Sequence, residues 1–239
     1  MVKLSYDLHI HSCLSPCGDD DMLPSNIVGM AALKELDVIA VTDHNSCKNC
    51  PAVMKLAEAY GVLAIPGMEI CTSEEVHVIC LFSELYKAML FDDFISSIIL
   101  KAPNNEDIFG KQQICDEDDN IIGNEPNLLI SAVDLSFDSL YDSVTRYGGI
   151  MIPAHIEKSS NSLLSNLGFI PPDSKFKCAE IKHIGYKDKL VEQHGYLKDC
   201  NIITNSDAHY LENINEPINF LYAGSKSIQD VLLSLTTLQ

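Results

Sequence analysis

Arginine is almost absent from this chain, since Arg146 is the only one among 239 residues. Arginine usually makes the bidentate contacts to phosphates and base edges on which nucleic-acid-binding proteins depend. The 34 aspartate and glutamate residues outnumber the 16 lysine and arginine residues, so the formal net charge is −18. We therefore expect that extended nucleic acid is not a partner of this protein.

Long apolar runs are absent as well. No segment reaches the roughly 18 consecutive apolar residues that a transmembrane helix needs. Met1–Asp7 leads into a short strand-like run that ends at the polar His9, without the apolar stretch of a signal peptide. We expect neither a membrane span nor a secretory leader.

The cysteines indicate a reducing compartment. There are nine, an odd number, and they are spread from Cys13 to Cys200. A chain of this length with 46% hydrophobic residues can bury a sizeable core without the help of disulfides. We predict a single domain over residues 1–239, located in the cytoplasm, with thiols that are mostly small buried side chains.

Short β-branched segments alternate with helical patterns, which is typical of βαβ units. The predicted strands are Leu4–His9, Val38–Val41, Val62–Ile65, Val76–Phe82, Gly149–Pro153, Cys178–Ile181 and Ile202–Thr204. The predicted helices are Asn26–Leu36, Pro51–Tyr60, Ser136–Tyr147 and Ser227–Leu235. This order predicts an α/β fold with parallel strands, and the chain length suits a single (β/α) barrel.

The alternation breaks between about residues 84 and 131, which we interpret as an insertion on the barrel. It contains an apolar helical pattern over Tyr86–Leu100 and two strand-like runs within Lys111–Ile122. The acidic Asp116–Asn120 between those runs is typical of a solvated hairpin turn, because it lacks the glycine and terminal glutamate of a calcium loop.

Six of the eight histidines lie in short polar clusters that follow the predicted strands, together with a carboxylate or thiol. The strand ends of a β/α barrel converge on one face, where active sites lie. In His9-Ile10-His11, residues two apart on a strand project to the same face and can bind one ion together. Any one of these histidines alone is as well explained by a hydrogen-bonded, partly buried imidazole. Together, with Glu69 and Asp207, they predict a site for divalent metal ions.

The ordered motifs resemble the PHP (polymerase and histidinol phosphatase) superfamily over most of the chain, from His9 to His209. They are H-x-H, then Thr42-Asp43-His44, then Glu69 followed by His77, then the isolated His155, and finally Ser206-Asp207-Ala208-His209. The resemblance implies a distorted (β/α)7 TIM-like barrel that holds three divalent metal ions, which zinc, manganese or iron would suit. The ligands it implies are His9, His11, Cys17, His44, Glu69, His77, His155, Asp207 and His209, with Glu69 bridging two of the ions.

Cys17 is where the chain departs from the resembled family, which usually has histidine or aspartate near this position. A thiolate can replace imidazole at a zinc or iron site and is a softer donor. We therefore expect Cys17 to ligate the third metal. The alternative is that Cys17 only packs and that Asp19 or Asp20 takes its place.

A second arrangement of the thiols is conceivable from spacing. Cys13 and Cys17 lie on the first loop, and Cys47 and Cys50 lie on the second. If adjacent strands brought the two loops together, the four thiols could form a tetrathiolate zinc site. Ordinary cysteines in a reducing compartment explain the same pattern.

Two further residues are candidates for roles at the site. Asp43 is expected to point away from the metals and accept a hydrogen bond from a ligand imidazole, with general base as the alternative. Lys158, three residues after His155, could contact a substrate phosphate, or it could be a solvated surface lysine. His183 and His194 match no motif and are expected to be structural or surface residues.

The function implied by the resemblance is hydrolysis of a phosphomonoester or small nucleotide by a metal-activated hydroxide at a trinuclear site. Three divalent ions would supply local positive charge for a small phosphorylated substrate despite the net charge of −18. Two alternatives remain at this point. One is a nuclease or exonuclease with the same metals, and the other is a metal-binding regulatory module without turnover.

Overall fold

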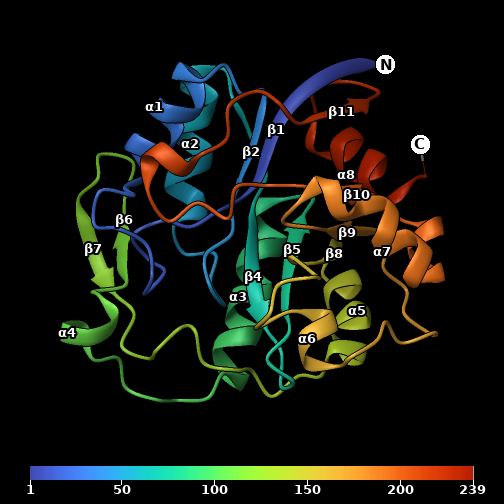
Figure 1. Cartoon of the computed structure of the whole chain (residues 1–239). Coiled ribbons are helices and arrows are strands. Elements are labelled where there is room, and N and C mark those ends of the chain that lie inside the picture. Colours follow the sequence, from blue (N-terminus) through green and yellow to red (C-terminus); the bar gives the residue numbers. More distant parts are fainter. Residues whose placement is uncertain (239) are drawn as a thin grey trace.

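The computed structural model describes residues 1–238, which form a mixed α/β fold with four sheets (Figure 1). The first sheet has the order β11-β1-β2-β3, with β1 (Val2–Ile10), β2 (Val38–Val41), β3 (Leu63–Ala64) and β11 (Phe220–Ala223). The second has the order β4-β5-β8, with β4 (Gly67–Cys71), β5 (His77–Phe82) and β8 (Gly149–Pro153). Two pairs complete the set, namely β9 (Cys178–Glu180) with β10 (Asn201–Ile203), and β6 (Gln113–Cys115) with β7 (Ile121–Asn124).

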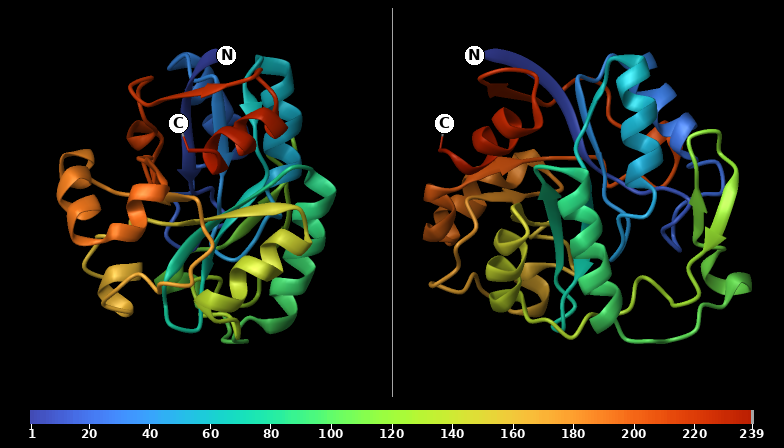
Figure 2. Two further views of the ribbon diagram at one scale, coloured as in Figure 1. Left: turned by 90° about the vertical axis from the view of Figure 1, so that its right-hand side faces the viewer. Right: turned by 180° about the vertical axis from the view of Figure 1, so that it is seen from behind.

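The helices surround these sheets, as the two further views show (Figure 2). They are α1 (Pro24–Leu33), α2 (Cys50–Tyr60), α3 (Leu85–Ile98), α4 (Glu106–Phe109), α5 (Phe137–Arg146), α6 (Leu163–Asn166), α7 (Lys187–Gln193) and α8 (Ile228–Thr236). Short 3-10 turns lie at Ile184–Tyr186, Gly195–Asp199 and Leu211–Asn213. Helix α1 begins with Pro24, whose fixed φ suits the first turn, and α2 ends at Gly61, which takes the left-handed φ of 70° that such an end favours.

The mixed α/β class predicted from the sequence is confirmed, but the closed (β/α)7 barrel is not seen. Within residues 1–238 the strands form four separate sheets and not one ring. The strands β4, β5 and β8 pair antiparallel, and only residues 72–76 connect β4 to β5. Such a connection is too short for the crossover that parallel neighbours need, so this part of the chain cannot continue a parallel barrel.

Two isolated bridges join the sheets at the place where the polar residues gather. Ile10 at the end of β1 pairs with Ala208, and His44 after β2 pairs with Glu69 in β4. Thr42 also donates its backbone N–H to the carbonyl of Ile10 at 2.8 Å. The backbone therefore brings segments from distant parts of the sequence together around one point.

The segment that breaks the alternation contains α3, α4 and the hairpin β6–β7, and the hairpin lies on the side of the molecule away from both termini (Figures 1 and 2). Gln113 in β6 donates its backbone N–H to the carbonyl of Cys13 at 2.9 Å. Asn49 accepts a hydrogen bond from the backbone of Cys115 at 2.9 Å and donates to the carbonyl of Gln113 at 3.1 Å. The hairpin is thus attached to the loop that follows β1.

The helices and the cysteines bear on the expectations about a membrane span and about the thiols. Within residues 1–238, no helix combines the length and the apolar character that crossing a bilayer would require. All nine cysteines are free thiols, and every one except Cys17 is buried.

Candidate metal centre

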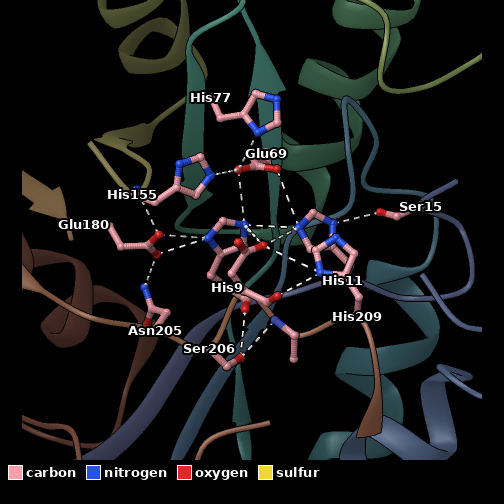
Figure 3. A network of polar contacts seen from close by, with 12 residues as sticks. His9, His11, Ser15, Glu69, His77, His155, Glu180, Asn205, Ser206 and His209 are labelled. Atoms are coloured by element: carbon pink, nitrogen blue, oxygen red, sulfur yellow. Dashed lines mark hydrogen bonds and ion pairs between the residues drawn. The ribbon is translucent and has the colours of Figure 1, made fainter. Parts of the chain in front are cut away.

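Polar side chains on or after the strands of three of the four sheets converge on one buried point (Figure 3). His9 belongs to β1, Glu69 to β4, His77 to β5 and Glu180 to β9, while the others follow β1, β2, β8 or β10 directly. The predicted ligands that the fold brings together here are His9, His11, Cys17, His44, Glu69, His77, His155, Asp207 and His209. Their role as ligands remains a prediction, whereas their proximity is a property of the structure.

Five imidazoles surround the carboxylate of Glu69, which is only 1% exposed. Its Oε1 lies 3.3 Å from Nε2 of His9, 3.1 Å from Nδ1 of His77 and 3.2 Å from Nε2 of His155. Its Oε2 lies 3.0 Å from Nδ1 of His44 and 3.6 Å from Nε2 of His11. Glu69 is therefore the carboxylate that links the histidines of the first sheet to those of the second.

His9 is held in one tautomer by Glu180. The carboxylate of Glu180 lies 3.1 and 3.2 Å from Nδ1 of His9, and because an ionised carboxylate only accepts, Nδ1 carries the proton. Glu180 also accepts from the backbone of His155 at 3.0 Å and from the Asn205 amide at 2.6 Å. Nε2 of His9 is thereby left to face the centre, an arrangement common for histidines that bind metals.

His11 is held in the same tautomer through a hydroxyl. Ser15 donates its hydroxyl to Asp43 at 2.7 Å, so the contact of 2.9 Å between Ser15 Oγ and His11 Nδ1 needs the proton on His11. Asp43 also accepts two bonds of 2.6 Å from the backbone and hydroxyl of Ser12. We expected an imidazole to donate directly to Asp43. Instead, His11 donates to the Ser15 hydroxyl, which in turn donates to Asp43.

The arrangement of nitrogen and oxygen atoms fits a bound cation. Nε2 of His9 and Nε2 of His11 are 3.2 Å apart, and each presents a lone pair to the other unless a cation or a proton lies between them. Nδ1 of His44 and Oε2 of Glu69 are buried and make no well-directed hydrogen bond. Buried polar atoms that make no hydrogen bond are costly in a protein interior, and a metal ion would satisfy them together.

The pKa shifts of His9, His11 and Glu69 also fit a bound cation. Burial lowers the pKa of the His9 imidazole, but Glu180 and Glu69 raise it more, so that it lies well above its usual value. Burial and the neighbouring His44 hold the pKa of His11 well below its usual value. Burial raises the pKa of the Glu69 carboxyl, yet His77 and His9 outweigh it and hold that pKa well below the usual range. The site thus keeps ionised carboxylates beside a neutral imidazole, which is a donor set for divalent metals.

Three sets of donors have their ligand atoms close enough to share an ion, within 4.8 Å of one another. They are His9, His11 and Glu69; His44, Glu69 and His77; and His11, Cys17, His44 and His209. The backbone of two other candidates is strained, since φ is 32° at His155 and 57° at Asp207. Strain of this kind persists where the surrounding structure fixes a functional geometry.

Two lysines lie at the rim of the centre. Lys158 Nζ is 3.2 Å from Oδ2 of Asp207, and Lys182 Nζ is 3.9 Å from the same oxygen. Lys182 also donates to the carbonyl of Ser206 at 2.8 Å. Both side chains are about one third exposed, at 39% and 34%, so their ammonium groups reach solvent beside the buried carboxylates.

The alternatives to Cys17 are placed elsewhere. Asp20 pairs with Lys111 at 3.0 Å on the surface, and Asp19 accepts a bond of 3.0 Å from the backbone of Asp21. Neither belongs to a set of donors that converge within residues 1–238.

The four thiols of the conceivable tetrathiolate site do not meet either. Sγ of Cys13 faces Sγ of Cys115 at 3.7 Å. Sγ of Cys47 and of Cys50 lie 3.2 and 3.4 Å from the carbonyl of Gly67. His183 packs against Tyr186, as expected for a residue outside the motifs.

Glu180, Ser15, Asn205 and Lys182 were not identified from the sequence. Glu180 lies within the predicted strand Cys178–Ile181 and is the last residue of β9, and an acidic residue in such an apolar run is a signal that could have identified it. Ser15 and Lys182 lie in no recognisable motif. Their contacts arise only when the loop after β1 and the segment after β9 fold against the centre.

Comparison with known proteins supports the resemblance to the PHP superfamily that the motifs indicate. The profile of the PHP domain family matches residues 7–166. An uncharacterized protein of Methanocaldococcus jannaschii is 33% identical over 101 residues, which cover 38% of this chain and 59% of that protein.

Solved structures share the fold at low identity. Endonuclease Q of Pyrococcus furiosus, described as lesion-specific, has a TM-score of 0.71 at 17% identity, covering 98% of this chain and 56% of the enzyme. A protein of Bifidobacterium adolescentis assigned as a metal-dependent phosphoesterase has a TM-score of 0.63 at 14% identity, covering 98% of this chain and 96% of that protein. This chain therefore spans little more than half the length of endonuclease Q and of the archaeal relative.

The expectation that extended nucleic acid is excluded is wrong. An endonuclease Q structure with a TM-score of 0.72, 17% identical and matched over 98% of this chain and 56% of its own, holds a 27-mer duplex with an abasic lesion at the active site. Low arginine content does not exclude such a substrate, because lysines, backbone N–H groups and bound metal ions also contact phosphates. The fold that this chain shares with endonuclease Q therefore holds a nucleic-acid duplex in that enzyme.

Proposed function

The chain belongs to the PHP domain family, and from this we propose that it is a metal-dependent phosphoesterase acting on a phosphomonoester or small nucleotide. The observation that carries the proposal is the convergence of five imidazoles on the buried Glu69, where Nδ1 of His44 and Oε2 of Glu69 make no hydrogen bond. We further propose that the chain is one PHP domain in which about residues 84–131 are an insertion. The attachment of the β6–β7 hairpin to the loop after β1 supports this.

The residues that would hold the metals are those that resemble the family's ligands. They are His9, His11, Cys17, His44, Glu69, His77, His155, Asp207 and His209. Up to three divalent ions, such as zinc, manganese or iron, would polarise the phosphoryl oxygens and acidify water at the site. Glu180 accepts a hydrogen bond from Nδ1 of His9, and Ser15 accepts one from Nδ1 of His11, so that both Nε2 atoms face the centre.

The chain also offers groups that would bind and orient the substrate. Lys158 and Lys182 present ammonium groups beside Asp207, where they would neutralise the charge of an incoming phosphate. Asp43 is fully engaged with Ser12 and Ser15, so we assign it to holding the loop in place and not to proton transfer. No side-chain nucleophile is required for hydrolysis by an activated water.

A second candidate is cleavage of a phosphodiester within nucleic acid. The likeness in fold to endonuclease Q, one structure of which holds a DNA duplex, favours this possibility. The reaction would use the same donors and differ in how the rim of the site admits the substrate.

One experiment tests both candidates and the non-catalytic alternative. The protein, reconstituted with zinc or manganese, is assayed for phosphate release from a panel of phosphomonoesters. It is also assayed for cleavage of a single-stranded oligonucleotide and of a duplex with an abasic site. The double variant His9→Ala/His11→Ala should lose all turnover, whereas His183→Ala, a surface histidine, should keep it. Bound metal without turnover on any substrate would instead indicate a regulatory module.

A further inference from the structure

One of the three donor sets differs from the others in its chemistry. Sγ of Cys17 lies within 4.8 Å of a ring nitrogen from each of His11, His44 and His209, and no carboxylate belongs to this set. The other two sets both include Glu69. The rings of His11 and His209 stack with centroids 4.3 Å apart, and those of His11 and His44 are 4.6 Å apart. The three imidazoles therefore form a compact group beside the thiol.

The loop that carries Cys17 is fixed on both sides of that residue. Ser12 and Ser15 bind Asp43, and Gly18 donates its backbone N–H to the carbonyl of Ser15 at 2.9 Å. A Cβ at Gly18 would lie 2.2 Å from the carbonyl oxygen of Ser12, so only glycine permits this turn. Asp19 then donates its backbone N–H to the carbonyl of His209 at 3.0 Å, which joins the loop directly to one of the three histidines.

The tautomer of His209 also suits a ligand. Its Nδ1 lies 2.8 Å from the backbone carbonyl of Asp207, and because a carbonyl only accepts, the proton is on Nδ1. Nε2 of His209 is thus left with its lone pair, as is Nε2 of His11. The thiol of Cys17 keeps exposed surface, so its proton can leave to solvent when sulfur binds a metal.

We propose that Cys17, His11, His44 and His209 form a position that selects a thiophilic divalent ion, such as zinc or cobalt, over manganese or magnesium. Thiolate and imidazole ligands favour zinc-like ions, whereas carboxylates suit harder ions. The positions that include Glu69 would accept the harder ions, so the centre would sort metals by position. This proposal rests on the metal centre of the proposed function. It adds which kind of metal each part of that centre binds.

Cobalt(II) is the probe, because a cobalt–thiolate bond gives a sulfur-to-metal charge-transfer band in the near ultraviolet. Protein freed of metal by a chelator is titrated with cobalt, and we expect this band in the unaltered chain. Cys17→Ser should abolish it. Cys13→Ser is the matched control in the same loop, because the Cys13 thiol faces Cys115, and it should keep the band.

Metal selection is measured separately, by dialysis against equimolar zinc and manganese followed by elemental analysis. Cys17→Asp, which keeps a ligand but removes sulfur, should shift the zinc-to-manganese ratio toward manganese. Removing a residue that only hydrogen-bonds to a metal ligand lowers metal affinity by about 10- to 100-fold. Because Cys17 would be a ligand itself, we expect the metal ratio to shift by about tenfold or more. Circular dichroism verifies that each variant is folded.

The outcomes separate this proposal from the phosphoesterase proposal, because neither readout requires turnover. A band that persists in Cys17→Ser, or that disappears in Cys13→Ser, overturns the assignment of Cys17. An unchanged metal ratio in Cys17→Asp overturns the selection. A Cys17-dependent band in a protein that hydrolyses no phosphoester would leave this proposal intact and remove the proposed activity.

Discussion

Glu180 and His9 are 171 residues apart in the chain, yet both carboxylate oxygens of Glu180 lie within 3.2 Å of Nδ1 of His9. Every group around Glu180 is a donor, since the backbone of His155 and the amide of Asn205 also donate to it. The carboxylate is 1% exposed. A carboxylate that accepts all of these bonds fixes the orientation of His9, and within residues 1–238 Glu180 belongs to none of the three sets of converging donors.

Replacing this carboxylate by an amide should weaken metal binding. In Glu180→Gln the amide NH2 must face at least one donor, which turns the His9 ring or changes its tautomer. We expect the affinity for zinc to fall by about 10- to 100-fold, the usual effect of removing such a partner. Calorimetric titration of the metal-free protein measures this loss.

The matched control for that titration is Glu192→Gln, an exposed position on α7. It should bind zinc as the unaltered protein does. Equal zinc affinity in Glu180→Gln and Glu192→Gln would show that the hydrogen bond to His9 does not contribute to metal binding.

The secondary structure could be predicted where apolar runs were unbroken. The strands Val38–Val41 and Gly149–Pro153 have the predicted bounds. Strand β4 was missed because Gly67 and Glu69 interrupt its apolar pattern. The antiparallel pairing of β4 with β5 and of β5 with β8 could not be predicted either. Which strands pair depends on the length of the connection and on packing, and hydrophobic periodicity shows neither.

The candidate site was predictable in part for a similar reason. His9 lies in β1 and His11 comes directly after its last residue, two positions along, so their shared direction follows from the strand geometry continued by one residue. The contact of Ser15 with both His11 and Asp43 depends on a loop whose turn is set by Gly18. The net charge led to the wrong expectation about nucleic acid for a different reason. A charge of −18 describes the whole surface and says little about a buried site that is proposed to bind cations.

Lys182 provides a test of how the site holds phosphate. In Lys182→Met the stem remains and the ammonium group is lost, so a substrate phosphate loses a charged contact while every residue proposed to bind metal is kept. We expect kcat/KM to fall by at least about tenfold, which corresponds to the lower range for a hydrogen bond to a charged group. The zinc content should not change.

Lys189→Met, on the exposed side of α7, is the control for the kinetic measurement. Its kcat/KM should equal that of the unaltered protein on the best substrate found. If Lys182→Met behaves like Lys189→Met, then Lys182 does not contact the substrate.

Asp37 should make folding stability depend on pH in the acidic range. Burial raises the pKa of its carboxyl, but hydrogen bonds from Ser5 and the charge of Lys226 outweigh this and lower it. A lowered pKa in the folded state gives stability that is present above the ordinary aspartate pKa and is lost as the pH falls through the folded value.

The variant Asp37→Asn should therefore be less stable than the unaltered protein by about 1 kcal/mol or less at pH 7, since the carboxylate is partly exposed. The difference should be smaller at pH 3, below the ordinary aspartate pKa, than at pH 7. Urea unfolding of both proteins at the two pH values measures it. A difference that stayed constant with pH would mean that the ionised carboxylate of Asp37 is not what stabilises the fold.

Removing metal should destabilise the protein through Glu69 and its surrounding imidazoles. A ligand that binds only the folded state adds about 2.7 kcal/mol when present at 100 times its dissociation constant. It would also satisfy the facing Nε2 atoms of His9 and His11 and the buried Nδ1 of His44, which makes no hydrogen bond. We expect the thermal midpoint in zinc to exceed that in chelator, and Glu69→Gln to lose most of this difference, because the amide supplies one oxygen where the carboxylate supplies two. A zinc-dependent rise of the same size in Glu69→Gln would place the stabilising ion elsewhere than at Glu69.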